Sequence, residues 1–152
     1  MTQLTENFSL AELTRSSTAD RLGIDNTPDD EQTRNLRAVC EHVLQPIRDS
    51  FKKPVNVSSG LRVLELNRAI GSNDTSQHTK GQAVDFEIWG VSNHTLAKWI
   101  QDNLLFDQLI LEFYQRGVPN SGWVHCSYVV GDNRKKVGTI IKGSGYVGGL
   151  VL

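Results

Sequence analysis

The 152-residue sequence predicts an α+β fold, in which helices pack on a small, mostly antiparallel sheet. Helical signals dominate the first third of the chain, and alternating apolar and polar residues dominate the second half. This grouping of elements is typical of α+β proteins rather than of regularly alternating α/β proteins. A chain of this length is expected to be a single domain, residues 1–152, which buries about two-thirds of its unfolded surface.

The N-terminal third carries three helix signals. Ser9-Leu10-Ala11-Glu12 is a capping box that begins a short helix, and Gly23 should end a second short helical turn. Thr27-Pro28-Asp29-Asp30 offers an N-cap, a proline at the first helical position and acids at the positive end of the helix dipole. We therefore expect a long helix from there to about Phe51, with a kink at Pro46, which has no backbone N–H to donate.

The remaining elements follow from strand alternation, helical spacing and turn residues. In order, they are a short strand over 54–58, a helix over 61–70 ended by Gly71, a polar loop over 72–81, a strand over 83–89, a helix from Ser92 to about 104, strands over 108–114, 122–130 and 136–141, and a Gly-rich tail over 143–152 whose packing the sequence leaves open.

The overall composition excludes several classes of protein. Lys and Arg number 16 against 17 Asp and Glu, without a basic cluster, which argues against nucleic acid as the main partner. No apolar stretch approaches the roughly 20 residues that span a bilayer. The segment 1–7 lacks a basic region followed by an apolar run, so we expect no signal peptide, synthesis in the cytoplasm and no membrane partner.

Three residues in the second half suggest a metal site. In the strand 82–88, Asp85 lies on the face opposite Val84 and Phe86, and in the later strand His125 lies opposite Val124. If the two strands are neighbours, Asp85 and His125 point at the same place, and the loop can bring His78 to it. Two imidazoles and one carboxylate suit a catalytic zinc, which keeps a fourth position open for a water whose pKa falls from about 16 to about 7.

The other histidines and the two cysteines have simpler interpretations. His42 lies in the long helix and His94 just after a helix cap, and we expect both to be structural. Cys40 and Cys126 are expected to be reduced thiols packed as small apolar residues. Cys126 directly follows His125, and neighbours in a strand point to opposite faces, so both cannot easily reach one ion.

These residues form a recognisable pattern. The run Ser76-Gln77-His78-Thr79-Lys80-Gly81-Gln82-Ala83-Val84-Asp85, followed by Trp123-Val124-His125, resembles the peptidase M15 family of zinc D-Ala-D-Ala carboxypeptidases, which includes phage endolysins that cut cell-wall peptides. Upstream, Ser59-Gly60-Leu61-Arg62 is similar to the family's Ser-Gly-aromatic-Arg segment, with Leu61 in the aromatic position. The resemblance covers roughly residues 7–128.

The resemblance implies a fold like that of the hedgehog and D-Ala-D-Ala peptidases, with His78, Asp85 and His125 as zinc ligands and Arg62 near the zinc. A guanidinium there can bind a substrate carboxylate or the oxyanion of a tetrahedral intermediate. The alternative for Arg62 is a surface ion pair with Glu65.

Three further residues are candidates for substrate contacts. Ser76 and Gln77 can hydrogen-bond the substrate or simply solvate a loop. Trp123 can form a wall of the substrate cleft or merely cover the sheet.

The general base is displaced from its usual position. Many relatives carry an acid three residues before the last histidine ligand, where this chain has Gly122. We predict that Glu112, a charged residue in an apolar strand, acts as the base, because such a residue is costly unless it faces solvent or a partner. Glu87 is the reserve candidate, and the third possibility is a chain without a base.

The sequence therefore predicts a zinc-dependent metallopeptidase that hydrolyses peptidoglycan stem peptides, as a carboxypeptidase or as an endolysin-type endopeptidase. The alternative is a catalytically inactive, zinc-containing module that binds cell-wall peptides; a chance arrangement in an unrelated α+β domain is the third. We expect a monomer with a peptidoglycan peptide as its partner. A phage-derived chain would act on the cell wall after its release.

Overall fold

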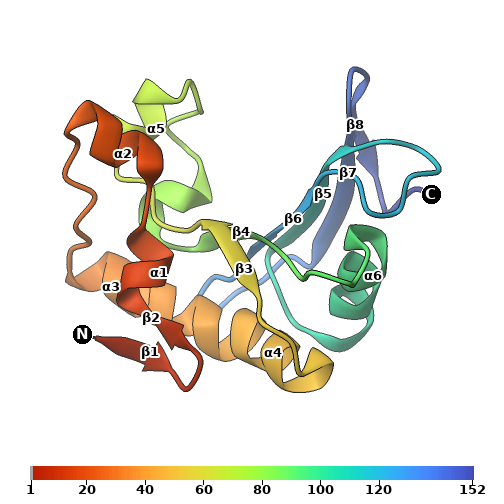
Figure 1. Ribbon diagram of the computed structural model, residues 1–152, viewed down its shortest axis with the longest axis horizontal. Coiled ribbons are helices and arrows are strands. Elements are labelled where there is room, and N and C mark those ends of the chain that lie inside the picture. The colour runs from red at the N-terminus through yellow and green to blue at the C-terminus, as the bar shows by residue number, and fades with distance from the viewer. Residues whose placement is uncertain (1) are drawn as a thin grey trace.

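The computed structural model describes residues 2–152 (Figure 1). In chain order its elements are β1 (Gln3–Thr5), β2 (Phe8–Ser9), α1 (Leu10–Thr14), α2 (Ser17–Leu22), α3 (Asp30–Val39), the π-helical turn η1 (Cys40–Leu44), α4 (Gln45–Phe51), β3 (Asn56–Ser59), α5 (Leu64–Ala69), the 3₁₀ turn η2 (Gln77–Lys80), β4 (Ala83–Glu87), α6 (Asn93–Asn103), β5 (Gln108–Tyr114), β6 (Trp123–Ser127), β7 (Lys136–Ile141) and β8 (Gly145–Gly148).

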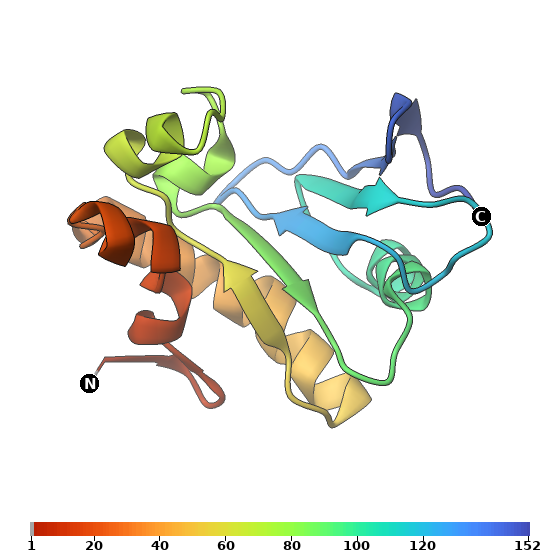
Figure 2. The same ribbon diagram turned by 45° about the horizontal axis from the view of Figure 1, so that its top comes forward.

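The main sheet confirms the predicted α+β class. It has six strands in the order β3-β4-β6-β5-β7-β8, and its neighbours are antiparallel except for the parallel pair β5 and β7. A separate hairpin of β1 and β2 lies at the N-terminus, away from the C-terminal strands (Figures 1 and 2). The two central strands β4 and β6 place their side chains in direct register.

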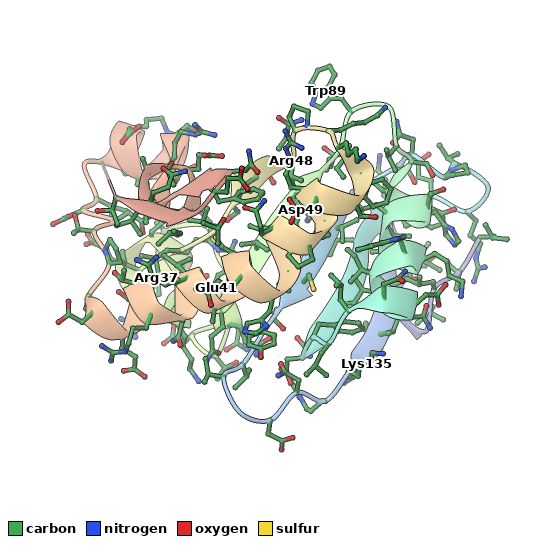
Figure 3. The ribbon with its side chains drawn as sticks, turned by 90° about the horizontal axis from the view of Figure 1, so that it is seen from below. Arg37, Glu41, Arg48, Asp49, Trp89 and Lys135 are labelled. Atoms are coloured by element: carbon green, nitrogen blue, oxygen red, sulfur yellow. The ribbon has the colours of Figure 1, made fainter. Side chains whose placement is uncertain are left out.

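One face of the sheet is apolar and lies under the helices. Its buried side chains, together with those of the helices, form one core. Figure 3 shows the continuous α3–η1–α4 helix and α6 in front of this face, with Arg37, Glu41, Arg48 and Asp49 on the long helix. The fully buried sheet residues of the core include Val84, Phe86, Leu109, Leu111, Val124 and Cys126. The alternation in the sequence predicted that Val84, Phe86 and Val124 belong to this face.

The long helix begins two residues later than predicted. Asp29, not Thr27, is the N-cap, because its carboxylate accepts the backbone N–H of Gln32 while the Gln32 side chain accepts the N–H of Asp29. Thr27 is already engaged with the Asp25 carboxylate. The predicted disturbance at Pro46 takes the form of the π-helical turn just before it, in which the N–H of Gln45 bonds to the carbonyl of residue 40.

The predicted helix over 61–70 shrinks to α5 because Val63, its N-cap, has a non-helical ψ of 156°, and the two residues before it contact other segments. The N–H of Leu61 donates to the carbonyl of Leu13, and the N–H of Arg62 donates to the carbonyl of His78. The predicted strands over 54–58, 83–89 and 122–130 are likewise shorter or shifted, whereas 108–114 and 136–141 coincide with β5 and β7.

The fold also bears on the two cysteines and on the question of a membrane-spanning helix. Cys40 and Cys126 are free and buried, as expected, and burial raises the pKa of Cys40 to about 12. Within residues 2–152, the helices all fall short of the length and apolar character that crossing a bilayer requires.

Candidate metal centre

Two adjacent strands bring the first two candidate ligands together. Asp85 in β4 is the direct cross-strand partner of His125 in β6, and both side chains lie on the face opposite the apolar core. The Nδ1 of His125 lies 2.9 Å from Oδ1 of Asp85. The predicted neighbourhood of these strands is therefore correct, and each residue is less than one-tenth exposed.

His78 completes the cluster from the 3₁₀ turn η2. Its Nδ1 lies 2.7 Å from the carbonyl oxygen of Gly60, an acceptor, so this nitrogen carries the proton. The lone pair is thereby left on Nε2, which is buried, makes no hydrogen bond within the described chain and lies 3.4 Å from Oδ1 of Asp85. The ligand atoms of the three residues all lie within 4.8 Å of one another. A buried, unpaired imidazole nitrogen beside a carboxylate and a second imidazole fits a zinc ion.

Two glycines, Gly60 and Gly81, determine the backbone path on either side of His78. Gly60 packs against α1 so closely that a Cβ would overlap the carbonyl oxygen of Leu13. From this position its own carbonyl reaches the His78 ring, and the N–H of Arg62 donates to the His78 carbonyl at 3.0 Å. Gly81 then ends the η2 turn with a φ of 73°, in the left-handed region that glycine tolerates best. The Ser-Gly-Leu-Arg segment therefore positions a ligand as well as an arginine.

The three groups influence one another's protonation. Burial alone would raise the pKa of Asp85, but the neighbouring imidazoles of His125 and His78 hold it well below its usual value. Burial lowers the pKa of His78. Burial also acts to lower the pKa of His125, yet the neighbouring carboxylates of Asp85 and Glu112 raise it overall. The cluster thus presents an ionised carboxylate and a neutral His78, the forms in which these residues bind metals.

Glu112 reaches the same place from β5. Its Oε1 lies 3.4 Å from Nδ1 of His125, and its side chain is about one-fifth exposed. Burial raises the pKa of Glu112. A carboxylate with a raised pKa, next to the candidate metal ligands and open to a cleft, has the properties expected of a general base.

The structure explains why position 122 has no acid. Gly122 has a φ of 68°, and a Cβ there would overlap the backbone carbonyl oxygen of Glu112 on the neighbouring strand. Phe113, beside it, has a φ of 52°, where the register between β5 and β7 shifts. A side chain at position 122 is therefore incompatible with this corner of the sheet.

Arg62 faces the cluster rather than Glu65. It is partly buried and forms no ion pair with Glu65 in the described part of the chain, and its Nε has no hydrogen-bond partner there. Burial lowers its pKa, while the charges of Asp85 and Glu112 act in the opposite direction. A guanidinium with unused donors is thus held beside the candidate metal position.

A cleft of about 620 Å³ opens over the cluster, and Arg62 and Glu112 line it. The candidate substrate contacts also line it: Ser76, Gln77 and Trp123.

The remaining candidates lie elsewhere. Glu87, the reserve base, is exposed and accepts a hydrogen bond from Asn93 at 2.9 Å. His42 stacks on Tyr128 with ring centroids 4.3 Å apart, and His94 is tilted against Tyr114, so neither belongs to the cluster.

Sequence reasoning missed two charged residues at this cleft. Arg134 lines it, and the buried Asp107 holds Arg134 in place. The available clue was position, because each residue stands one or two places before a predicted strand. Whether those strands were neighbours could not be read from the chain.

Comparison with known proteins gives one match. A family model described as Peptidase M15 matches residues 6–127, which is more than half of the chain. No curated protein matches the sequence. The matched range contains the three cluster residues, Arg62 and Glu112, and it ends before Arg134.

Proposed function

Because the chain belongs to the peptidase M15 family, whose members are zinc peptidases of peptidoglycan peptides, we propose that it hydrolyses a peptide bond of the peptidoglycan stem, with residues 1–152 acting as one domain. One observation carries this proposal. His78, Asp85 and His125 converge within 4.8 Å in a cleft where Glu112 lies 3.4 Å from His125. The candidate metal ligands and the candidate base thus lie together in one cleft, which the guanidinium of Arg62 also lines.

The proposed ligands are His78 through Nε2, His125 through Nδ1 and the Asp85 carboxylate. When bound there, zinc supplies a Lewis acid and an activated water. Gly60 keeps the proton of His78 on Nδ1, so the ligand nitrogen stays available. The strand register fixes the relative positions of the other two ligands, because Asp85 and His125 lie directly opposite each other on adjacent strands.

Glu112 is the proposed general base. It accepts the proton of the attacking water and passes it to the nitrogen of the leaving amine. Its raised pKa favours this exchange, because a base works best when its pKa lies nearer the working pH. Its position on β5 replaces the acid that Gly122 cannot supply.

Arg62 is proposed to neutralise negative charge on the substrate. Its unpaired Nε and its place in the cleft suit either the oxyanion or a terminal carboxylate. Ser76 and Gln77 are proposed to hydrogen-bond the peptide, and Trp123, which stacks on Phe113 at 5.1 Å, to form the cleft wall.

Mass spectrometry of muropeptides tests the activity and identifies the bond. Purified cell walls are digested with zinc-loaded protein, with and without a chelator. Loss of terminal D-Ala would identify a carboxypeptidase, and internal cleavage an endopeptidase of the endolysin type. Unchanged muropeptides in the presence of zinc would refute the proposal.

Substitution of Glu112 by Gln tests the base. The amide cannot take a proton, so we expect the cleavage rate to fall by about 10²- to 10⁴-fold while the zinc content stays full. Glu87→Gln is the matched control, because Glu87 lies outside the cleft, and it should retain the rate. A Glu112→Gln protein as active as the wild type would assign the proton transfer to another group.

A further inference from the structure

Asp107 is a buried carboxylate that the proposed chemistry does not use. It is 2% exposed and accepts four hydrogen bonds. One comes from the Nε2 of Gln77 at 2.8 Å, and the other three come from the backbone N–H, Nε and Nη2 of Arg134 at 2.7–3.0 Å. Hydrogen bonds from Arg134 lower the pKa of Asp107 to about 2. The residue therefore stays ionised and fixes two groups at the cleft.

This arrangement orients the Arg134 guanidinium. Asp107 occupies Nε and Nη2, whereas Nη1 has no partner among residues 2–152. The Arg134 side chain is 58% exposed and lines the cleft. An arginine held in a planar fork by one carboxylate presents its remaining N–H groups in a fixed direction and loses little entropy on binding a second one.

The sheet places Arg134 and Arg62 on opposite flanks of the metal cluster. Registered pairs form one row across the sheet, which runs from Ser59 in β3 through Asp85, His125 and Ile110 to Gly138 in β7. Arg62 follows the β3 end of this row by three residues, and Arg134 precedes the β7 end by four. Figure 3 labels the adjacent Lys135 on the segment between β6 and β7. A peptide lying across the cluster would meet one arginine on each side.

The charges of the cleft favour an acidic ligand. Its cationic lining residues are Arg62, Lys80 and Arg134, and its acidic ones are Asp85 and Glu112. A bound dication adds to the positive side. We propose that Arg134, positioned by Asp107, recognises a carboxylate of the stem peptide distant from the scissile bond, so that the enzyme prefers stems in which this group is free rather than amidated. This inference rests on the proposed function.

Asp107 also has a structural role that the test must separate. The backbone N–H of Arg134 and that of Lys136 both donate to Asp107, and these bonds anchor the segment before β7. Arg134→Gln keeps both backbone bonds and removes the guanidinium. A purely structural role predicts equal effects of this substitution on every substrate, whereas recognition predicts an effect that depends on the substrate carboxylate.

The experiment uses two synthetic stem pentapeptides that differ in one group. The second residue is γ-linked D-glutamate in one, with a free carboxylate, and γ-linked D-isoglutamine in the other, with a carboxamide. We expect wild-type KM to be about 10-fold lower for the acidic peptide, as a charge-assisted hydrogen bond allows. Arg134→Gln should abolish this preference by raising KM for the acidic peptide alone, with kcat and zinc content unchanged. Arg116→Gln, which removes an exposed cation outside the cleft, should keep the preference.

Three results separate the possible failures. Cleavage of both peptides with the same KM, unaffected by Arg134→Gln, would overturn this inference and leave the proposed function intact. Cleavage of neither peptide would count against the proposed function. In that case calorimetric binding of the two peptides to zinc-loaded Glu112→Gln protein, with and without Arg134→Gln, decides the inference directly, since equal affinities would overturn it. Asp107→Asn weakens the two side-chain hydrogen bonds that orient the Arg134 guanidinium, so it should reduce the preference for the acidic peptide only in part.

Discussion

Two buried aspartates at the same cleft differ in the partners they are given. Asp107 is surrounded by permanent donors, which are a guanidinium, a side-chain amide and a backbone N–H. Asp85 contacts two imidazoles, and one of them keeps an unpaired nitrogen, Nε2 of His78. Both carboxylates have lowered pKa values, yet only Asp107 has a complete set of partners without a ligand.

The contrast separates a structural ion pair from a binding site. A buried charge is tolerated when hydrogen bonds and an opposite charge satisfy it, as at Asp107. At Asp85 one partner, Nε2 of His78, is itself an acceptor without a donor, so a cation can complete this cluster. Lowered pKa values alone do not distinguish the two cases, whereas the unused nitrogen does.

Removing a ligand should produce the largest effect. We expect His125→Ala to weaken zinc binding by more than about 100-fold, because even loss of a supporting residue can cost that much. His94→Ala is the control, since its ring lies outside the cluster. Zinc content by atomic absorption after dialysis gives the comparison. Full zinc in His125→Ala protein would mean that the cluster is another ion pair of the Asp107 kind.

Zinc-linked stability should distinguish the two aspartates. At a free zinc concentration of about 100 times Kd, binding should stabilise the wild-type fold by about 2.7 kcal/mol. Asp107→Asn should lower the stability of the protein but keep this zinc increment, whereas Asp85→Asn should lose it. Urea unfolding with zinc and with chelator measures both. An equal increment in the two variants would mean that the two carboxylates do not differ in their relation to the metal.

Acid should weaken the Asp107 pair by a smaller amount. Its pKa is lowered from 3.8 to about 2 in the folded protein, so its contribution is present above about pH 4 and disappears as the pH falls through about 2. The shift corresponds to about 2 kcal/mol. The metal-free wild type should lose this stability between about pH 4 and pH 2 relative to Asp107→Asn, and parallel pH curves for the two proteins would contradict it.

Local rules predicted where two residues of the candidate metal cluster lie. Alternation in β4 and β6 assigned Asp85 and His125 to the face opposite the core, and the structure places them in direct register. Glu112 followed from the cost of a charge in an apolar strand, and its side chain faces the cleft. The placement of Asp85 and His125 needed a two-residue period and the assumption that two strands are neighbours, whereas the full set of zinc ligands came from the resemblance to the peptidase M15 family.

The Asp107–Arg134 pair could not be predicted for a different reason. Its members are 27 residues apart, and their contact depends on the parallel pairing of β5 and β7, the one parallel pair in the described sheet. Neither residue stands out by composition, because charged residues before strands are common. The sequence placed the N-cap of the long helix at Thr27 instead of Asp29, because threonine is also a good capping residue. In the structure the Thr27 hydroxyl donates to the Asp25 carboxylate instead.

The close approach of Gly122 to Glu112 turns two sequence positions into one choice. An acid at position 122 needs a Cβ, and this corner of the sheet has no room for one. A relative with an acid at the equivalent of position 122 would have to turn the corner differently. In newly sequenced members of the family, glycine there should occur together with an acid on the neighbouring strand. The residues at positions 112 and 122, considered together, would divide such sequences into members with the acid on the neighbouring strand and members with the acid three residues before the last histidine.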